Sequence, residues 1–279
     1  MSQEQALGES ALCSHTLVLE VSYEGTSYAG FAQQERQTHV QTIAGELRCA
    51  LRTLLRRDVE LTCAGRTDAG VHARAQFVSL PTSEQESETL SAQRLLRSLA
   101  AVLPNDIVVT HLWRARPGFS ARFDALARTY KYRIFLGSVP PLFCKQWVWW
   151  IRGIQSLDIE AMELAAQALI GEHDFKSFCK SASAEGKPTS RYVESINFMP
   201  EAAFGEQMVT MSIVGNAFLH SMVRTIMGTL VEVGSGRQEP SWVSDVLAAC
   251  DRQAAGPCAP AQGLTFWDVR YQEGLLQPW

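Results

Sequence analysis

The sequence contains no long apolar run, no C-x-x-C cysteine pair and no excess of positive charge. Its 279 residues are 46% hydrophobic and 19% charged, a composition typical of an ordinary globular chain. The longest apolar stretches, such as residues 147–151, are far shorter than the roughly 20 residues that cross a bilayer. The first ten residues are polar and contain two glutamates, unlike a signal peptide. We therefore expect a cytoplasmic protein without a membrane segment.

Metal-binding and disulfide patterns are also missing. The seven cysteines are odd in number and lie far apart, which fits neither a disulfide framework nor a zinc site. His72, His220 and the pair His173-Asp174 do not have the spacing of a metal-binding motif. We expect reduced thiols and no metal, so that a metal-dependent hydrolase is the least favoured function.

The charges are unevenly distributed although the net charge is only -4. Between Arg114 and Arg133 there are six cations and one anion, Asp124. Four aromatic residues are interleaved with these cations: Phe119, Phe123, Tyr130 and Tyr132. Cations for phosphate and aromatic rings for base stacking are how single-stranded or looped RNA is usually held. A solvated charged face explains the composition equally well.

Hydrophobic periodicity predicts two rounds of strand, helix, strand, strand, helix, strand. The strands are expected at 16–21, 59–63, 76–80, 107–113, 129–136, 191–198, 207–214 and 264–269. The helices are expected near 40–54, 95–103, 158–170 and 216–233, with an additional short one from Pro240. Alternation along 129–136 places Tyr130 and Tyr132 on one face of that strand, and Lys131 and Arg133 on the other.

This order of elements is that of the ferredoxin-like or RRM-like fold, in which a mainly antiparallel sheet carries its helices on one face. The sequence therefore predicts an α+β protein of two tandem β-α-β-β-α-β units with a cleft between them. We expect a flexible tail at 1–13, an N-terminal domain at 14–117 and a C-terminal domain at 118–279.

One loop is a candidate for chemistry. Gly65-Arg66-Thr67-Asp68-Ala69-Gly70 joins two apolar strands, and its glycines suit a sharp turn that presents a carboxylate. Arg66 is near enough in sequence to pair with Asp68 or to reach a phosphate, and a nearby cation favours the ionised form that a nucleophile or base needs. Taken alone, the loop is better explained as a hairpin turn.

The unbroken string from Gly65 to Ala73, with Gln76 following, resembles the active-site loop of the tRNA pseudouridine synthase A family. Further segments resemble motifs of that family in the same order: 23–31, 103–107, 119–132, 171–175 and 216–224. The resemblance covers about residues 16 to 270. Phe31 and Ala32 stand where the family commonly has Trp-Gln, and Ser120 where it commonly has His. We expect those departures to alter contacts to RNA or to the loop, but not the chemistry at Asp68.

The resemblance implies an enzyme that isomerises uridine to pseudouridine at positions 38, 39 and 40 of the tRNA anticodon stem-loop. It also implies a homodimer that needs no cofactor. Asp68 would be the nucleophile, Tyr130 would stack on the uracil and take part in proton removal, and Arg224 would pair with Asp68. The same resemblance assigns substrate binding to Arg66, Thr67, His72, Arg122 and Arg128. It leaves open whether Asp68 attacks C1′, attacks C6 or removes a ribose proton.

A different class of function remains as the alternative, namely a non-catalytic RNA-binding module. The RRM-like order of elements and the basic segment 114–133 favour it. Such a module would bind tRNA in a salt-dependent way without changing its nucleoside composition.

Overall fold

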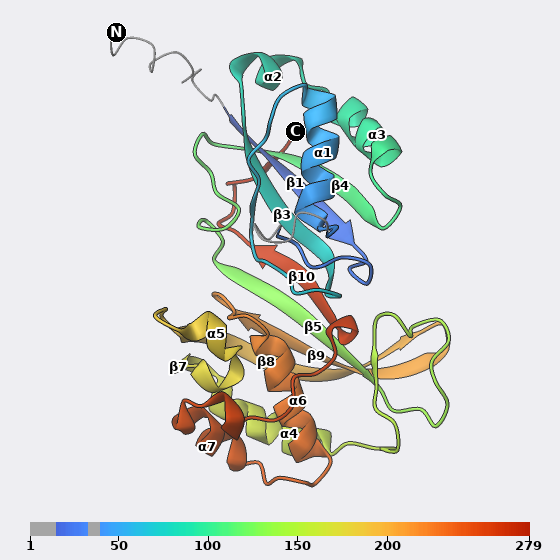
Figure 1. Ribbon diagram of the computed structural model, residues 1–279, viewed down its shortest axis with the longest axis vertical. Coiled ribbons are helices and arrows are strands. Elements are labelled where there is room, and N and C mark those ends of the chain that lie inside the picture. Colours follow the sequence, from blue (N-terminus) through green and yellow to red (C-terminus); the bar gives the residue numbers. More distant parts are fainter. Residues whose placement is uncertain (1–14, 33–39) are drawn as a thin grey trace.

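The computed structural model describes residues 15–32 and 40–279, apart from the side chains of residues 183 and 184. The tail predicted at 1–13, with Cys13, lies outside the described residues. The described chain is a mixed α+β fold built on a large, mainly antiparallel sheet (Figure 1). No helix within these ranges has both the length and the apolar content to cross a membrane.

The sheet contains eleven strands, nine of them in the order β11-β4-β1-β3-β10-β5-β9-β8-β7, with β2 paired to β3 and β6 paired to β5. Their bounds are β1 His15–Tyr23, β2 Thr62–Cys63, β3 His72–Thr82, β4 Ile107–Ala115, β5 Ala127–Phe135, β6 Trp149–Trp150, β7 Gly171–Asp174, β8 Ser190–Ala203, β9 Glu206–Gly215, β10 Leu264–Arg270 and β11 Gln277–Pro278. The predicted strands are therefore present, although β2 is shorter and β3 begins four residues earlier than expected.

One parallel pairing joins the two halves of the sheet. In β10, Thr265 pairs with His72 of β3, and Phe266 pairs with Ala73. The strands of the two predicted units therefore form one continuous sheet, because the last long strand inserts between the two groups. The chain then returns to the first half, where β11 pairs with β4 and the Trp279 indole donates to the Leu90 carbonyl at 3.1 Å. The domain boundary near residue 117 stays a prediction.

The helices lie against the strands of both halves (Figure 1). Their bounds are α1 Ile43–Leu55, α2 Glu84–Thr89, α3 Ala92–Val102, α4 Ile159–Ala166, α5 Ser181–Ala184, α6 Met222–Gly234 and α7 Trp242–Ala249. The short helix α2 was not expected, although Ser83 and Glu86 form a capping box that is readable from the sequence.

Helix α6 begins six residues later than the sequence predicted. Asn216 is held at the end of the sheet, because its backbone N–H donates to the Tyr192 carbonyl at 3.0 Å and its side-chain oxygen accepts from the Tyr192 N–H at 3.0 Å. Ser221, just before the helix, has a left-handed backbone with φ of 62°. The segment 216–221 is therefore a non-helical lead into α6, and it carries part of the candidate site.

Candidate active site

Asp68 lies in the loop between β2 and β3, and the segment 23–31 braces this loop from one side. The Phe31 N–H donates to the Thr67 carbonyl at 3.1 Å, and the Gly70 N–H donates to the Tyr28 carbonyl at 3.3 Å. Gly30 has a φ of +102°, and a Cβ there would lie only 2.7 Å from the Thr67 oxygen. Two motifs that are more than thirty residues apart in sequence thus form one rigid unit around Asp68.

The start of α6 surrounds the Asp68 carboxylate. Ser221 donates from Oγ to Oδ2 at 2.9 Å, and Arg224 donates from Nη1 to the same oxygen at 3.1 Å. The His220 Nε2 lies 3.4 Å from the other oxygen, Oδ1. The Asp68 side chain nevertheless keeps 21% of its surface exposed. The structure thus brings Arg224 to Asp68, as the resemblance implied, while their catalytic roles stay predictions.

Arg224 is also held by a second partner, Ala259. Its Nε donates to the Ala259 carbonyl at 2.8 Å, and the Ala259 N–H donates to the Arg224 carbonyl at 3.1 Å. A guanidinium held at two points has little freedom to leave the carboxylate. Sequence reasoning predicted this arginine but not Ser221, and it considered His220 beside Asp68 only as part of a metal site that it did not favour. Both lie within the motif 216–224, at positions that the motif leaves unspecified.

Tyr130 is the aromatic residue of the site and is only 7% exposed. Its ring packs edge to face on Phe218 and Phe266, with centroids 5.1 and 4.9 Å apart. A Cβ on Gly65 would lie 2.9 Å from the Phe266 ring and 3.6 Å from the Tyr130 hydroxyl, so the loop that carries Asp68 approaches this cluster closely. Burial, followed by the nearby Tyr23 and Asp68, raises the pKa of Tyr130 well above its usual value. Its hydroxyl is therefore protonated at neutral pH.

Polar side chains of β1 and β3 hold the Asp68 loop by hydrogen bonds. Tyr23 and Thr67 share a hydrogen bond of 2.8 Å between their hydroxyl groups. Gln76 donates to the Gly65 carbonyl at 2.6 Å and accepts from the Gly65 N–H at 3.4 Å. Burial raises the pKa of Tyr23. Thr67 is 7% exposed and bonded within the protein, so its predicted contact with substrate stays a prediction.

The arginines predicted to bind substrate occupy two kinds of environment. Arg66 and Arg122 are exposed. Arg128 is buried, and burial lowers its pKa. Its guanidinium donates to the carbonyls of Ala64, Ala125, Asn216 and Arg122, at 3.1 Å to both Ala64 and Ala125 and 2.5 Å to Asn216. Arg128 thus connects the start of the Asp68 loop to the segment before α6, and its contact with RNA stays a prediction.

The aromatic residues of the basic segment are mostly unavailable for base stacking. Phe119 is buried with its ring 5.3 Å from that of Tyr271, and Tyr132 is fully buried. These two rings belong to the core and are not available to stack on bases. Phe123 is 80% exposed, with the Arg122 guanidinium 5.3 Å from its ring centre.

The positions that depart from the family pattern have local roles. Phe31 is buried beside Tyr23, with ring centroids 6.3 Å apart. Ser120 begins a turn in which its N–H donates to Asp124 at 2.7 Å and its hydroxyl accepts from the Phe123 N–H at 3.3 Å. The turn aims Phe123 and Arg122 outward.

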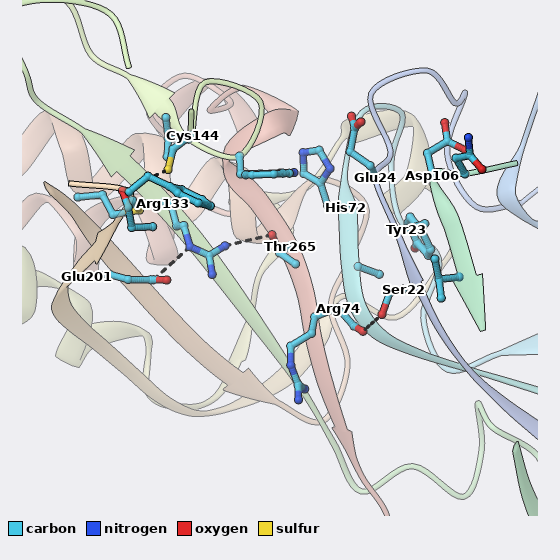
Figure 2. Close-up of a pocket in the computed structure, with 18 residues that line it drawn as sticks. Ser22, Tyr23, Glu24, His72, Arg74, Asp106, Arg133, Cys144, Glu201 and Thr265 are labelled. Carbon is cyan, nitrogen blue, oxygen red and sulfur yellow. Dashed lines mark hydrogen bonds and ion pairs between the residues drawn. The ribbon is translucent and has the colours of Figure 1, made fainter. Parts of the chain in front are cut away.

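His72 is the predicted site residue that points elsewhere. It is 3% exposed, and its Nδ1 accepts from the Gly25 N–H at 3.1 Å. The ring lines a separate cavity with Glu24 and Arg133 (Figure 2). Across the described residues, no three His, Cys, Asp or Glu side chains cluster in a way that would hold a metal ion.

A carboxylate that is contacted by three side chains from a distant segment, residues 220–224, yet is partly open to solvent, is typical of an enzyme active site. A family model described as tRNA pseudouridine synthase matches residues 20–124 and 165–272, which include Asp68 and Arg224. The chain belongs to the tRNA pseudouridine synthase family.

Individual relatives agree with this assignment over nearly the whole chain. The tRNA pseudouridine synthase A of Moorella thermoacetica is 37% identical over 255 residues, covering 91% of this chain and 99% of the relative. The enzyme of the same name from Brevibacillus brevis is 39% identical over 252 residues, covering 90% of this chain and 97% of the relative. Among solved structures, a Cbf5-Nop10-Gar1 complex aligns with 78% of this chain and 45% of that chain, at 12% identity and a TM-score of 0.39, too distant to define the fold.

Proposed function

We propose that the protein isomerises uridine to pseudouridine in tRNA, at positions 38, 39 and 40 of the anticodon stem-loop, with Asp68 as nucleophile. The observation that carries the proposal is the arrangement of Arg224 and Ser221 on one oxygen of the partly exposed Asp68 carboxylate. Membership of the tRNA pseudouridine synthase family supports it independently.

The hydrogen bonds distinguish the two oxygens of Asp68. Oδ2 accepts from Ser221 and Arg224, whereas Oδ1 has the longer contact to His220 at 3.4 Å. The less engaged oxygen keeps more of its electron density for attack, so we assign the attack to Oδ1. The two bonds to Oδ2 hold the carboxylate in one orientation, which lowers the entropy lost on reaching the transition state.

The remaining residues enclose and place the nucleotide. Isomerisation must break the glycosidic bond, turn the base and rejoin it through C5, so the freed uracil must be retained in the pocket. Tyr130 supplies an aromatic surface for that base and lies close to the loop. A uridine inside a stem must first leave its stack, at a cost of a few kcal/mol. Exposed Arg66, Arg122 and Phe123 are suited to offset that cost by holding the distorted RNA.

The same proposal includes the assembly and the internal repeat. We infer that the protein acts in the cytoplasm, as its lack of a long apolar run suggests, and that it is a homodimer without a cofactor, as the resemblance of its motifs implies. We also infer two ferredoxin-like units, supported by the strand orders β4-β1-β3 with β2, and β10-β5-β9-β8. Asp68 of the first unit then meets the start of α6 of the second, which puts the site at their junction.

The direct test is release of tritium from 5-tritiated uridine in tRNA. The wild-type protein should release it, and Asp68→Asn, which keeps the size of the side chain but removes its charge, should release none. Asp245→Asn, at an exposed position on α7, is the matched control and should behave as the wild type. Undiminished release by Asp68→Asn would contradict the nucleophile assignment. If the wild type bound tRNA without changing its nucleosides, the non-catalytic RNA-binding module would replace the proposal.

A further inference from the structure

Ser221 occupies the position before α6 at which a serine normally caps a helix. In each of α1, α2, α3 and α4, a side-chain oxygen at this position accepts from a backbone N–H of the first turn. The Ser221 hydroxyl makes no such bond to α6. It donates instead to Oδ2 of Asp68 at 2.9 Å. The helix thus lacks a stabilising cap, and the hydroxyl contacts the proposed nucleophile in its place.

The backbone of Ser221 is also in a conformation that disfavours serine. The Met222 N–H donates to the Leu219 carbonyl at 3.1 Å and closes a turn in which Ser221 is the third residue. Its φ of 62° and ψ of 8° match the third position of a type II turn, which glycine or asparagine usually occupies because a Cβ is crowded there. Ser221 is therefore strained, and strain of this kind is concentrated at functional sites.

The turn brings two donors to one oxygen of Asp68. Because α6 starts directly after Ser221, Arg224 follows within its first turn, and residues three positions apart lie on one face of a helix. Both side chains reach Oδ2, at 2.9 and 3.1 Å. The Ser221 carbonyl accepts from the Thr225 N–H at 2.9 Å, which fixes Ser221 to the end of α6. The hydroxyl is therefore presented to Asp68 from a rigid element.

We propose that Ser221 is a positioning residue of the isomerase, and that its left-handed backbone serves to direct the hydroxyl to Asp68. The inference rests on the proposed function, in which Oδ1 of Asp68 attacks the nucleotide. One bond from Arg224 leaves the carboxylate free to rotate about that contact, whereas a second donor on Oδ2 fixes where Oδ1 points. A small misplacement of an attacking atom slows the reaction strongly. Loss of the hydroxyl should therefore slow the chemistry and leave tRNA affinity unchanged.

The first test compares two variants that both lack the hydroxyl. Ser221→Ala keeps a Cβ and thus the strain, whereas Ser221→Gly removes both. Single-turnover kinetics on tRNA should show the same loss in the two variants, about tenfold or more, with a Kd for tRNA within about threefold of the wild type. Ser221→Gly should nevertheless melt about 2 °C or more above Ser221→Ala. Turnover should follow the hydroxyl, and the melting temperature should follow the backbone.

Ser241→Gly is the matched control. Ser241 is an exposed serine before α7 that also makes no cap bond, but its φ of -62° is that of an ordinary helix. This variant should keep wild-type turnover. Wild-type turnover in both Ser221 variants, when Asp68→Asn is inactive, would overturn the positioning role and leave the proposed function intact. Unequal losses in the two variants would overturn it as well, because turnover would then depend on the backbone rather than on the missing hydroxyl.

A second test needs no substrate. Asp68→Ala leaves the Ser221 hydroxyl without its carboxylate, so that the strain remains without the hydrogen bond. Adding Ser221→Gly to Asp68→Ala should therefore raise the melting temperature by about 2 °C or more, and by more than the same change in the wild type, which also loses the hydrogen bond. Equal shifts in the two backgrounds would contradict the inference. Unequal shifts together with tritium release by Asp68→Asn would show that the contact exists but that the proposed function is wrong.

Discussion

The inner wall of the Asp68 site and its rim differ in how far their side chains are buried and in what their polar groups face. The inner wall consists of buried or half-buried residues: Tyr23, Gln76, Arg128, Tyr130 and Arg224. The rim consists of exposed residues: Arg66, Arg122 and Phe123. Most wall residues direct their polar groups to the loop or to Asp68, whereas the rim side chains extend into solvent.

The comparison separates positioning from recognition. Charged groups buried with several partners fix geometry and are costly to remove. Exposed cations contribute little to folding but are available to phosphate. Residue type alone does not distinguish the two, since Arg122 and Arg128 are six positions apart in one basic segment and belong to different classes.

Replacing the buried arginine of the wall should have the largest effect. Arg128→Ala leaves four backbone carbonyls without their donor and opens a cavity beside the Asp68 loop. We expect the free energy of unfolding to fall by about 3 kcal/mol or more, as urea denaturation would measure. Arg122→Ala, the matched change at the rim, should alter it by less than about 0.5 kcal/mol. Similar losses for the two variants would break the distinction between wall and rim.

Arg224→Ala should show that the wall acts on turnover rather than affinity. Its partner is Asp68 and not phosphate, so we expect turnover to fall about a hundredfold while the Kd for tRNA changes by less than about threefold. Single-turnover kinetics and filter binding would measure both. Arg237→Ala, which breaks an exposed pair with Glu232 at the other end of α6, is the control. Normal turnover combined with much weaker binding would show that Arg224 serves recognition, like the rim residues, and not positioning.

Much of the fold was predictable because periodicity reports which face of a strand or helix is buried. The strands of both halves and α4 follow this signal closely. Two features carry no periodic signal, namely the parallel pairing of β10 with β3 and the late start of α6. Both depend on contacts between distant segments, such as the hydrogen bonds between Asn216 and Tyr192.

The site was predictable to the extent that its residues lie in motifs. Asp68, Tyr130 and Arg224 were predicted in this way; the structure brings Arg224 to Asp68, and the catalytic roles stay predictions. Ser221 was not found, because its role depends on a left-handed backbone that no residue type announces. Arg128 and His72 were assigned to substrate by motif alone, and only the structure shows that one is bonded to carbonyls and that the other faces a second cavity.

The two tyrosines of the wall, together with Tyr271, should also make stability sensitive to high pH. Burial raises the pKa of Tyr23, Tyr130 and Tyr271, whereas tyrosine in the unfolded chain titrates near 10. Above about pH 10 the unfolded chain therefore loses protons that the folded chain retains. The free energy of unfolding should be unaffected by these groups below that pH and should fall above it, by up to about 1.4 kcal/mol per pH unit for each tyrosine.

Urea denaturation between about pH 8 and pH 11 would measure this slope. Tyr130→Phe should reduce it by the contribution of one group. A slope that is unchanged in this variant would mean that Tyr130 is open to solvent, which would place it with the rim.

The rim should show the smallest effect and a different signature. Arg122→Ala removes one exposed cation beside Phe123. If Arg122 contacts a phosphate, tRNA affinity should fall by about threefold to tenfold, and the slope of log K against log salt should become shallower by about 1. Turnover of bound tRNA should stay at the wild-type value, in contrast to Arg224→Ala. An unchanged salt slope would show that Arg122 does not neutralise a phosphate, and recognition would then have to be assigned to Arg66 and its neighbours.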